Sequence, residues 1–178
     1  VDSASGAVFA ATSPDGKIYR IDSAGKSAVF FDPEDKYIWS LVFRNGFLYA
    51  GSGEKGVIYR IPADGKGVPW VDTDEVHVVA LAFAANGDLI AGTDPNSLVL
   101  RIGADGKPFA ILDTPLQETH AFTVASDGTM YALAIAASAA TTGADQGGVS
   151  VVESNTTSAS RLDIASAGTS SVPSRRDV

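Results

Sequence analysis

The residues best suited to chemistry in this sequence are its two histidines and the carboxylates around them. Glu118 precedes His120 by two positions, so both side chains would point to the same side of an extended strand. An imidazole beside a carboxylate can carry a proton or contribute to a metal site. Further carboxylate oxygens would favour calcium or magnesium. The candidate ligand-binding residues are Asp15, Glu54, Asp74, Glu75, His77, Asp94, Glu118 and His120.

Motifs for nucleotide binding and for nucleophilic catalysis are missing from the sequence. The glycines form neither GxGxxG nor GxxxxGK[ST], and no serine sits in a nucleophile elbow. Charged side chains in loops are usually just solvated, and most histidines serve no chemical role. We therefore assign no catalytic residue and predict no cofactor, with a calcium or magnesium site as the alternative.

An internal repeat organises the chain that must position these residues. The segments GAVFAATSPDGKIYRI, GFLYAGSGEKGVIYRI and GDLIAGTDPNSLVLRI contain Arg20, Arg60 and Arg101 at the same place, about 40 residues apart. A period of this length is typical of β-propeller blades. The sequence therefore predicts an all-β fold, a partial propeller of three to four four-stranded antiparallel blades.

Each repeat predicts four strands in a fixed order. A largely apolar run such as Ile38 to Phe43 predicts an inner strand covered on both faces. Asn45-Gly46 after it is a strong signal for a tight hairpin turn. An LYAGS-like second strand, a YRI-like third strand and an outer strand follow. Pro69 and Pro108 lie at the start of two of the predicted outer strands. They support this order, because proline has no N–H to donate and is tolerated at the edge of a sheet.

The predicted units divide the chain at its polar connections. Residues 1–32 form a partial blade, 37–73 and 77–114 form complete blades, and 120–153 form a second partial blade in which 148–153 would be a displaced third strand. Residues 154–178 are rich in Ser, Thr and Ala, which bury too little apolar area to offset the ordering entropy. We predict a linker or insertion there, and we interpret its glycosylation sequon at Asn155 as a chance match.

The loops of one face are where a ligand would bind. In such blades the loop between the second and third strands and the connection from the outer strand to the next inner strand lie on the same face. The repeated arginines are interpreted as structural groups that pair with carboxylates or carbonyls, and Trp39 and Trp70 as packing between blades. The residues expected on the loop face are Asp15, Lys17, Asp35, Lys36, Tyr37, Glu54, Lys55, Asp74, Glu75, His77, Asp94, Asn96, Glu118 and His120.

Composition excludes some partners and leaves others open. The formal net charge of −8 argues against a nucleic-acid or anionic-membrane surface and favours cations or basic partners. With 0 Cys the chain has neither disulfides nor thiolate metal sites. No apolar run approaches the roughly 20 residues needed to cross a bilayer. Because the first residue is Val1, we expect a processed or excised chain, and a periplasmic or extracellular location.

The repeated GxLYAGT, GxIYRI and DGK patterns resemble bacterial β-propeller repeats of the WD40-like and NHL-like group. The resemblance covers roughly residues 6–133, and the Trp-Asp and Gly-His signatures of WD40 repeats are absent. It implies that this chain is a piece of a larger bacterial propeller, since closed rings use about 4 to 8 blades. Residues outside the chain would then complete the ring, or the open blade edges would self-associate.

Members of this group range from interaction scaffolds to sensors, lactonases and lyases. We therefore expect a non-catalytic binding or interaction module for a protein or small-molecule ligand. One alternative is a lactonase-like propeller hydrolase or lyase with a divalent metal in the channel, for which Glu118, His77 and His120 would be tested first. A second alternative is the ligand-sensing ectodomain of a signalling protein.

Overall fold

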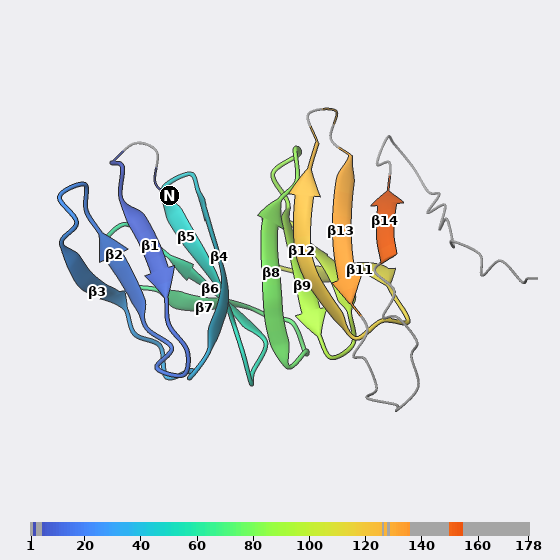
Figure 1. Cartoon of the computed structure of the whole chain (residues 1–178), viewed down its shortest axis with the longest axis horizontal. Coiled ribbons are helices and arrows are strands. Elements are labelled where there is room, and N and C mark those ends of the chain that lie inside the picture. The colour runs from blue at the N-terminus through green and yellow to red at the C-terminus, as the bar shows by residue number, and fades with distance from the viewer. Residues whose placement is uncertain (1, 3–4, 126, 128, 136–149, 155–178) are drawn as a thin grey trace, which may run out of the picture.

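The structure is a computed structural model that describes residues 2, 5–125, 127, 129–135 and 150–154. All helix or strand structure in this part of the chain is β-strand, arranged in four antiparallel sheets that follow one another in chain order (Figure 1). The sheets are the blades of a partial β-propeller, so the predicted fold class is confirmed. No helix among the described residues is long and apolar enough to cross a membrane.

The strands occur in the order that the repeat predicts. Sheet 1 contains β1 (Val8–Ala11), β2 (Ile18–Ile21) and β3 (Ser27–Phe31). Sheet 2 contains β4 (Ile38–Arg44), β5 (Phe47–Ser52), β6 (Val57–Ile61) and β7 (Val68–Asp72). Sheet 3 contains β8 (His77–Phe83), β9 (Leu89–Asp94), β10 (Leu98–Ile102) and β11 (Pro108–Asp113). Sheet 4 contains β12 (Glu118–Val124), β13 (Met130–Ile135) and β14 (Ser150–Ser154).

The two end sheets have three described strands instead of four. Sheet 1 begins with β1, which corresponds to the second strand β5 of sheet 2, so it lacks a described inner strand. In sheet 4 the predicted third strand is present as β14, which pairs with β13 from Met130↔Ser154 to Ala134↔Ser150. The predicted linker begins at residue 154, which is the last residue of β14, and the rest of it, with its sequon, lies outside the described residues.

Apolar side chains between successive sheets hold the fold together. One cluster joins sheets 1 and 2 around Ile18, Leu48 and Ile61, each no more than 2% exposed. A second joins sheets 2 and 3 around Ile58 and Leu89, and a third joins sheets 3 and 4 around Ile90 and Met130. Burial of such side chains contributes about 1.5–3 kcal/mol each. Each sheet is therefore stabilised mainly by its neighbours, as in other repeat folds.

Turn chemistry fixes the register of the hairpins. Asn45 and Gly46 both have positive φ, 51° and 80°, which a two-residue turn of the primed type requires. The turn connects β4 to β5 with Arg44 opposite Phe47. Because side chains alternate between the two faces, this register decides which residues contact the preceding sheet and which contact the following one.

Candidate functional site

A β-bulge recurs near the start of every described inner strand. Pairing shifts between Ile38 and Ser40 in β4, between Val78 and Ala80 in β8, and between Thr119 and Ala121 in β12. The extra residues are Trp39, Val79 and His120. A bulge redirects a side chain out of the regular alternation, and bulges are frequent next to binding sites. The three bulges therefore place one extra residue each at equivalent positions near the loop face, and these residues are a tryptophan, a valine and a histidine.

A cluster of aromatic rings lies on the loop face where sheets 2 and 3 meet. The rings of Tyr37 and Trp39 are parallel, with an interplanar angle of 1° and centroids 5.2 Å apart. The His77 ring meets Trp39 edge-on, with centroids 6.1 Å apart and an interplanar angle of 88°. Trp39 nevertheless stays 46% exposed. The expected packing of Trp39 between blades therefore holds only in part, because the indole contacts His77 of sheet 3 while about half of it faces solvent. Trp70 packs against the cluster between sheets 2 and 3, as expected.

Gly53 makes room for this aromatic cluster. A Cβ at Gly53 would lie 2.4 Å from Trp39 Nε1, 2.9 Å from His77 Nδ1 and 3.0 Å from the Tyr37 Cβ. Real side chains do not approach that closely, so the three rings take these positions only because residue 53 is glycine. The sequence repeat conceals this role, since the equivalent positions are Ser13 and Asp94.

His77 is held in one orientation by the backbone. Its Nδ1 accepts a hydrogen bond from the Glu54 N–H at 3.1 Å. In the neutral ring the proton must then sit on Nε2, which is left as a donor. Glu54 has a positive φ of 67° and forms an ion pair with Lys36 at 3.7 Å. The Glu54 loop thus fixes both the imidazole and the charge beside it.

His120 and Glu118 lie on the same side of β12, as their spacing predicts, and their side chains are in contact. Nδ1 of His120 lies 2.5 Å from Oε1 of Glu118, and the His120 side chain is 60% exposed. On β12, Glu118 occupies the position that His77 has on β8, and His120 occupies the position of Val79. An exposed imidazole with a carboxylate on one nitrogen is able to exchange protons with a ligand through the other.

The remaining predicted site residues lie on the loop face but do not converge. Glu75 accepts a hydrogen bond from Asn96 at 2.9 Å. Asp15 and Asp74 are exposed, and Asp94 is partly buried at the end of β9. Within the described residues no three His, Asp or Glu side chains gather in a way that could hold a metal ion. In the part of the chain that the structure describes, the carboxylates therefore form a dispersed acidic surface.

Asp35 is a buried carboxylate that the sequence placed among the exposed loop residues. It is 3% exposed, accepts a hydrogen bond from the Tyr59 hydroxyl at 2.6 Å, and lies 3.0 Å from Lys55 Nζ. Burial alone would raise the pKa of Asp35, but the Tyr59 hydrogen bond and the Lys55 ammonium together outweigh it and lower the pKa. Burial and the Asp35 carboxylate raise the pKa of the Tyr59 hydroxyl. Asp35 is therefore a structural anchor between sheets 1 and 2.

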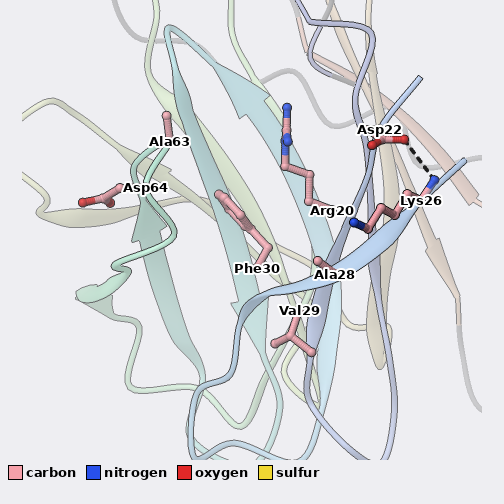
Figure 2. A pocket seen from close by; sticks show the side chains of 8 residues that line it. All are labelled: Arg20, Asp22, Lys26, Ala28, Val29, Phe30, Ala63 and Asp64. Carbon is pink, nitrogen blue, oxygen red and sulfur yellow. Dashed lines mark hydrogen bonds between the residues drawn. The ribbon is translucent and has the colours of Figure 1, made fainter. Parts of the chain in front are cut away.

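A cavity of about 400 Å³ opens on the opposite rim, between sheets 1 and 2 (Figure 2). Arg20, Lys26 and Phe30 line one side, and Asp64 lies on the other. Arg60, the counterpart of Arg20, covers the Phe47 ring at 3.8 Å, and Arg101 lies 3.8 Å from Asp88. The predicted pairing with a carboxylate thus fits Arg101, whereas Arg60 stacks on an aromatic ring and its buried Nε has no hydrogen-bond partner among the described residues. The cavity's cations are matched by the carboxylates of Asp22 and Asp64, so its lining favours neither sign of charge.

No known family model and no curated protein matches the sequence. Solved structures with a similar fold include the WD40 β-propeller domain of Doa1, with a TM-score of 0.65 and 17% identity over 74% of this chain and 45% of that one. A virginiamycin B lyase from Staphylococcus aureus in complex with quinupristin has a TM-score of 0.63 and 18% identity over 88% of this chain and 54% of that one.

Regucalcin, a calcium-binding protein from Agrobacterium tumefaciens, has a TM-score of 0.62 and 18% identity over 78% of this chain and 52% of that one. This chain thus spans about half the length of the propellers it matches. At these identities the likeness establishes the β-propeller fold alone, and the similar structures include a calcium-binding protein as well as a lyase.

Proposed function

We propose that this chain is a non-catalytic binding module that docks a positively charged partner with its loop face. The observation that carries the proposal is Trp39, a large aromatic side chain that remains 46% exposed although it stacks on Tyr37. Exposed tryptophans are favoured as anchors in binding surfaces because they combine a large apolar area with little loss of side-chain freedom.

The charge around Trp39 supports a cationic partner. The lysines of the loop face are Lys17, Lys36 and Lys55, and each lies within 4.0 Å of a carboxylate. Asp15, Glu34 and Asp74 stay exposed on that face without an ion pair among the described residues. A lysine or arginine side chain placed on the indole would gain a cation–π contact and the field of these carboxylates.

Truncation of the tryptophan tests the proposal. Dye-labelled peptides rich in lysine and arginine, with acidic peptides of matched length, are titrated with the chain while the fluorescence anisotropy of the peptide is recorded. We expect micromolar binding of basic peptides and a loss of about tenfold or more in Trp39→Ala. Phe109→Ala is the control, because Phe109 is 64% exposed on the outer strand of sheet 3. Equal binding by Trp39→Ala and the parent chain would overturn the proposal.

A second candidate function rests on the contact between His120 and Glu118. With this pair as general acid or base, the chain would be a lactonase-like hydrolase or a lyase. Virginiamycin B lyase has a similar fold, which makes such an activity worth testing. Turnover of cyclic ester substrates that is lost in His120→Ala and kept in Trp39→Ala would favour the enzyme over the binding module.

A further inference from the structure

One face of sheet 1 has no described sheet packed against it. The residues on this face are apolar, and their counterparts in sheets 2 and 3 are buried. Val8 aligns with Leu48 and Leu89, which are 2% and 1% exposed, yet Val8 is 43% exposed. Ile21 aligns with Ile61 and Ile102, which are 0% and 1% exposed, and Ile21 is only partly buried. The same positions thus differ in burial only because sheets 2 and 3 have a sheet packed against this face.

The remaining residues of this face follow the same rule. Ala10 pairs with Tyr19 across β1 and β2, and Val8 pairs with Ile21, so the four side chains share one face. The counterparts of Ala10 and Tyr19 in sheet 2, Ala50 and Tyr59, are 0% and 8% exposed. Single exposed apolar residues are ordinary, but a contiguous apolar face marks an interaction surface. We call these four residues the sheet 1 end face.

The chain also carries a surface of the kind that covers such a face. In the interior junctions the covering surface is the far face of the preceding sheet, for example Tyr49 of sheet 2 against Phe83 of sheet 3. The far face of sheet 4 has Ala121 opposite Leu133. Leu133 stands where sheets 2 and 3 have Gly51 and Gly92, so a sheet docked there would lie further away than in the interior junctions.

We propose that a second copy of this chain covers the sheet 1 end face with the far face of its own sheet 4. The two copies are related head to tail, and the same contact then forms twice. Two sets of four sheets give a ring of about eight blades, within the size that propellers close. The self-association expected from the open blades would thus occur between the sheet 1 end face of one copy and the far face of sheet 4 of the other.

The electrostatics of this contact predict its salt dependence. Each copy carries a formal charge of −8, so two copies repel each other, whereas the contact itself is apolar. Added salt screens the repulsion and leaves the apolar contact in place. Dimerisation should therefore strengthen between 50 and 500 mM sodium chloride.

Light scattering coupled to size exclusion tests the interface with the 178-residue chain. We expect a dimer at about 50 µM, and Val8→Asp should weaken dimerisation by about 30-fold or more because it buries an unpaired charge. Val68→Asp is the matched control, since Val68 is 57% exposed on the outer strand of an interior sheet. Circular dichroism melting confirms that each variant is folded. A folded parent chain that stays monomeric at 200 µM would overturn the proposal, as would a dimer that Val8→Asp leaves intact.

Mixing two variants distinguishes head-to-tail association from symmetric contact between two sheet 1 end faces. Val8→Asp and Leu133→Asp should each be monomeric alone, because each spoils both contacts of the dimer. An equimolar mixture should recover a heterodimer, since one contact then joins two unmodified faces. If Leu133→Asp dimerises as the parent chain does, the head-to-tail arrangement is wrong.

Discussion

Asp35, Tyr59 and Lys55 form a buried anchor whose hydrogen bond can be removed singly. In Tyr59→Phe the hydroxyl that donates to Asp35 at 2.6 Å is lost, and a buried carboxylate oxygen is left without its donor. We expect the free energy of unfolding to fall by about 1–3 kcal/mol, measured by urea denaturation at pH 7. Tyr49→Phe is the control, because Tyr49 also lies in sheet 2, its ring contacts with Trp70 and Phe83 are kept, and its hydroxyl has no hydrogen bond to a described residue.

The same anchor predicts a pH dependence. The pKa of Asp35 is lowered in the folded chain, so its stabilising effect is complete above the ordinary value of 3.8 and is lost as the pH falls through the folded pKa. The stability difference between the parent chain and Tyr59→Phe should therefore shrink below about pH 4. A difference that stays constant from pH 7 to pH 3 would show that the hydroxyl acts through packing and not through the carboxylate.

Sequence reasoning about single residues rested on regular alternation along a strand, which the bulges interrupt. The spacing of Glu118 and His120 predicted that both point to the same side, and they are in contact although His120 is the extra residue of the bulge in β12. Sequence reasoning did not foresee that Trp39, the extra residue of the bulge in β4, stays 46% exposed. It also placed Asp35 among the solvated loop residues, because a loop carboxylate in a sequence does not reveal that a tyrosine from the next sheet folds over it.

At the scale of elements, glycines set how closely neighbouring sheets approach. A Cβ at Gly51 would lie 2.7 Å from the Val78 carbonyl oxygen and 2.7 Å from Val78 Cγ1, both on the inner strand of sheet 3. Backbone cannot yield as a flexible side chain does, so Gly51→Ala forces sheets 2 and 3 apart. We expect a loss of about 1–3 kcal/mol of unfolding free energy, measured by chemical denaturation.

Gly103 provides the control for this substitution. A Cβ there would meet nothing closer than the Asp105 carboxylate at 3.3 Å, a contact that a small side-chain movement relieves. Gly103→Ala should therefore change stability by no more than about 0.5 kcal/mol. Equal effects of the two substitutions would mean that backbone freedom, and not the spacing between sheets, decides the outcome.

The order of the elements was readable because the repeat supplies the same signals several times. Apolar inner runs, Asn-Gly turns and edge prolines agree with one another in sheets 2 and 3, and consistent local signals are what a sequence needs to specify a fold. The spacing between sheets was not readable. Gly51 and Gly92 align with Ala11 and Leu133, and only the packed sheets show which of these positions contacts a neighbour.

At the scale of the whole molecule, charge is divided between the two rims. Arg20, Arg44, Arg60 and Arg101 lie toward the rim of the hairpin turns, together with Lys26, Lys66 and Lys107. The loop face is dominated by carboxylates, and its lysines are paired. A partner approaching from solution therefore meets an acidic face on one side and a mixed face on the other.

This division predicts how a basic ligand associates. Neutralising two loop-face carboxylates beside the aromatic cluster, in Glu54→Gln with Asp74→Asn, should weaken binding of a lysine-rich peptide and flatten its salt dependence. The slowed step should be association, on the order of tenfold at 50 mM salt in stopped-flow fluorescence. Asparagine suits position 74, whose φ is 59°.

The opposite rim supplies the control with the same change in charge. Asp64→Asn with Asp105→Asn keeps the oxygen that accepts the Lys66 and Lys107 N–H groups, so the turns should stay intact. If binding depends on the acidic loop face, this variant should keep the association rate of the parent chain within about twofold, because its altered charges lie at the far rim and are screened. Equal slowing by both double variants would mean that net charge alone attracts the ligand, and the loop face would then have no special part in recognition.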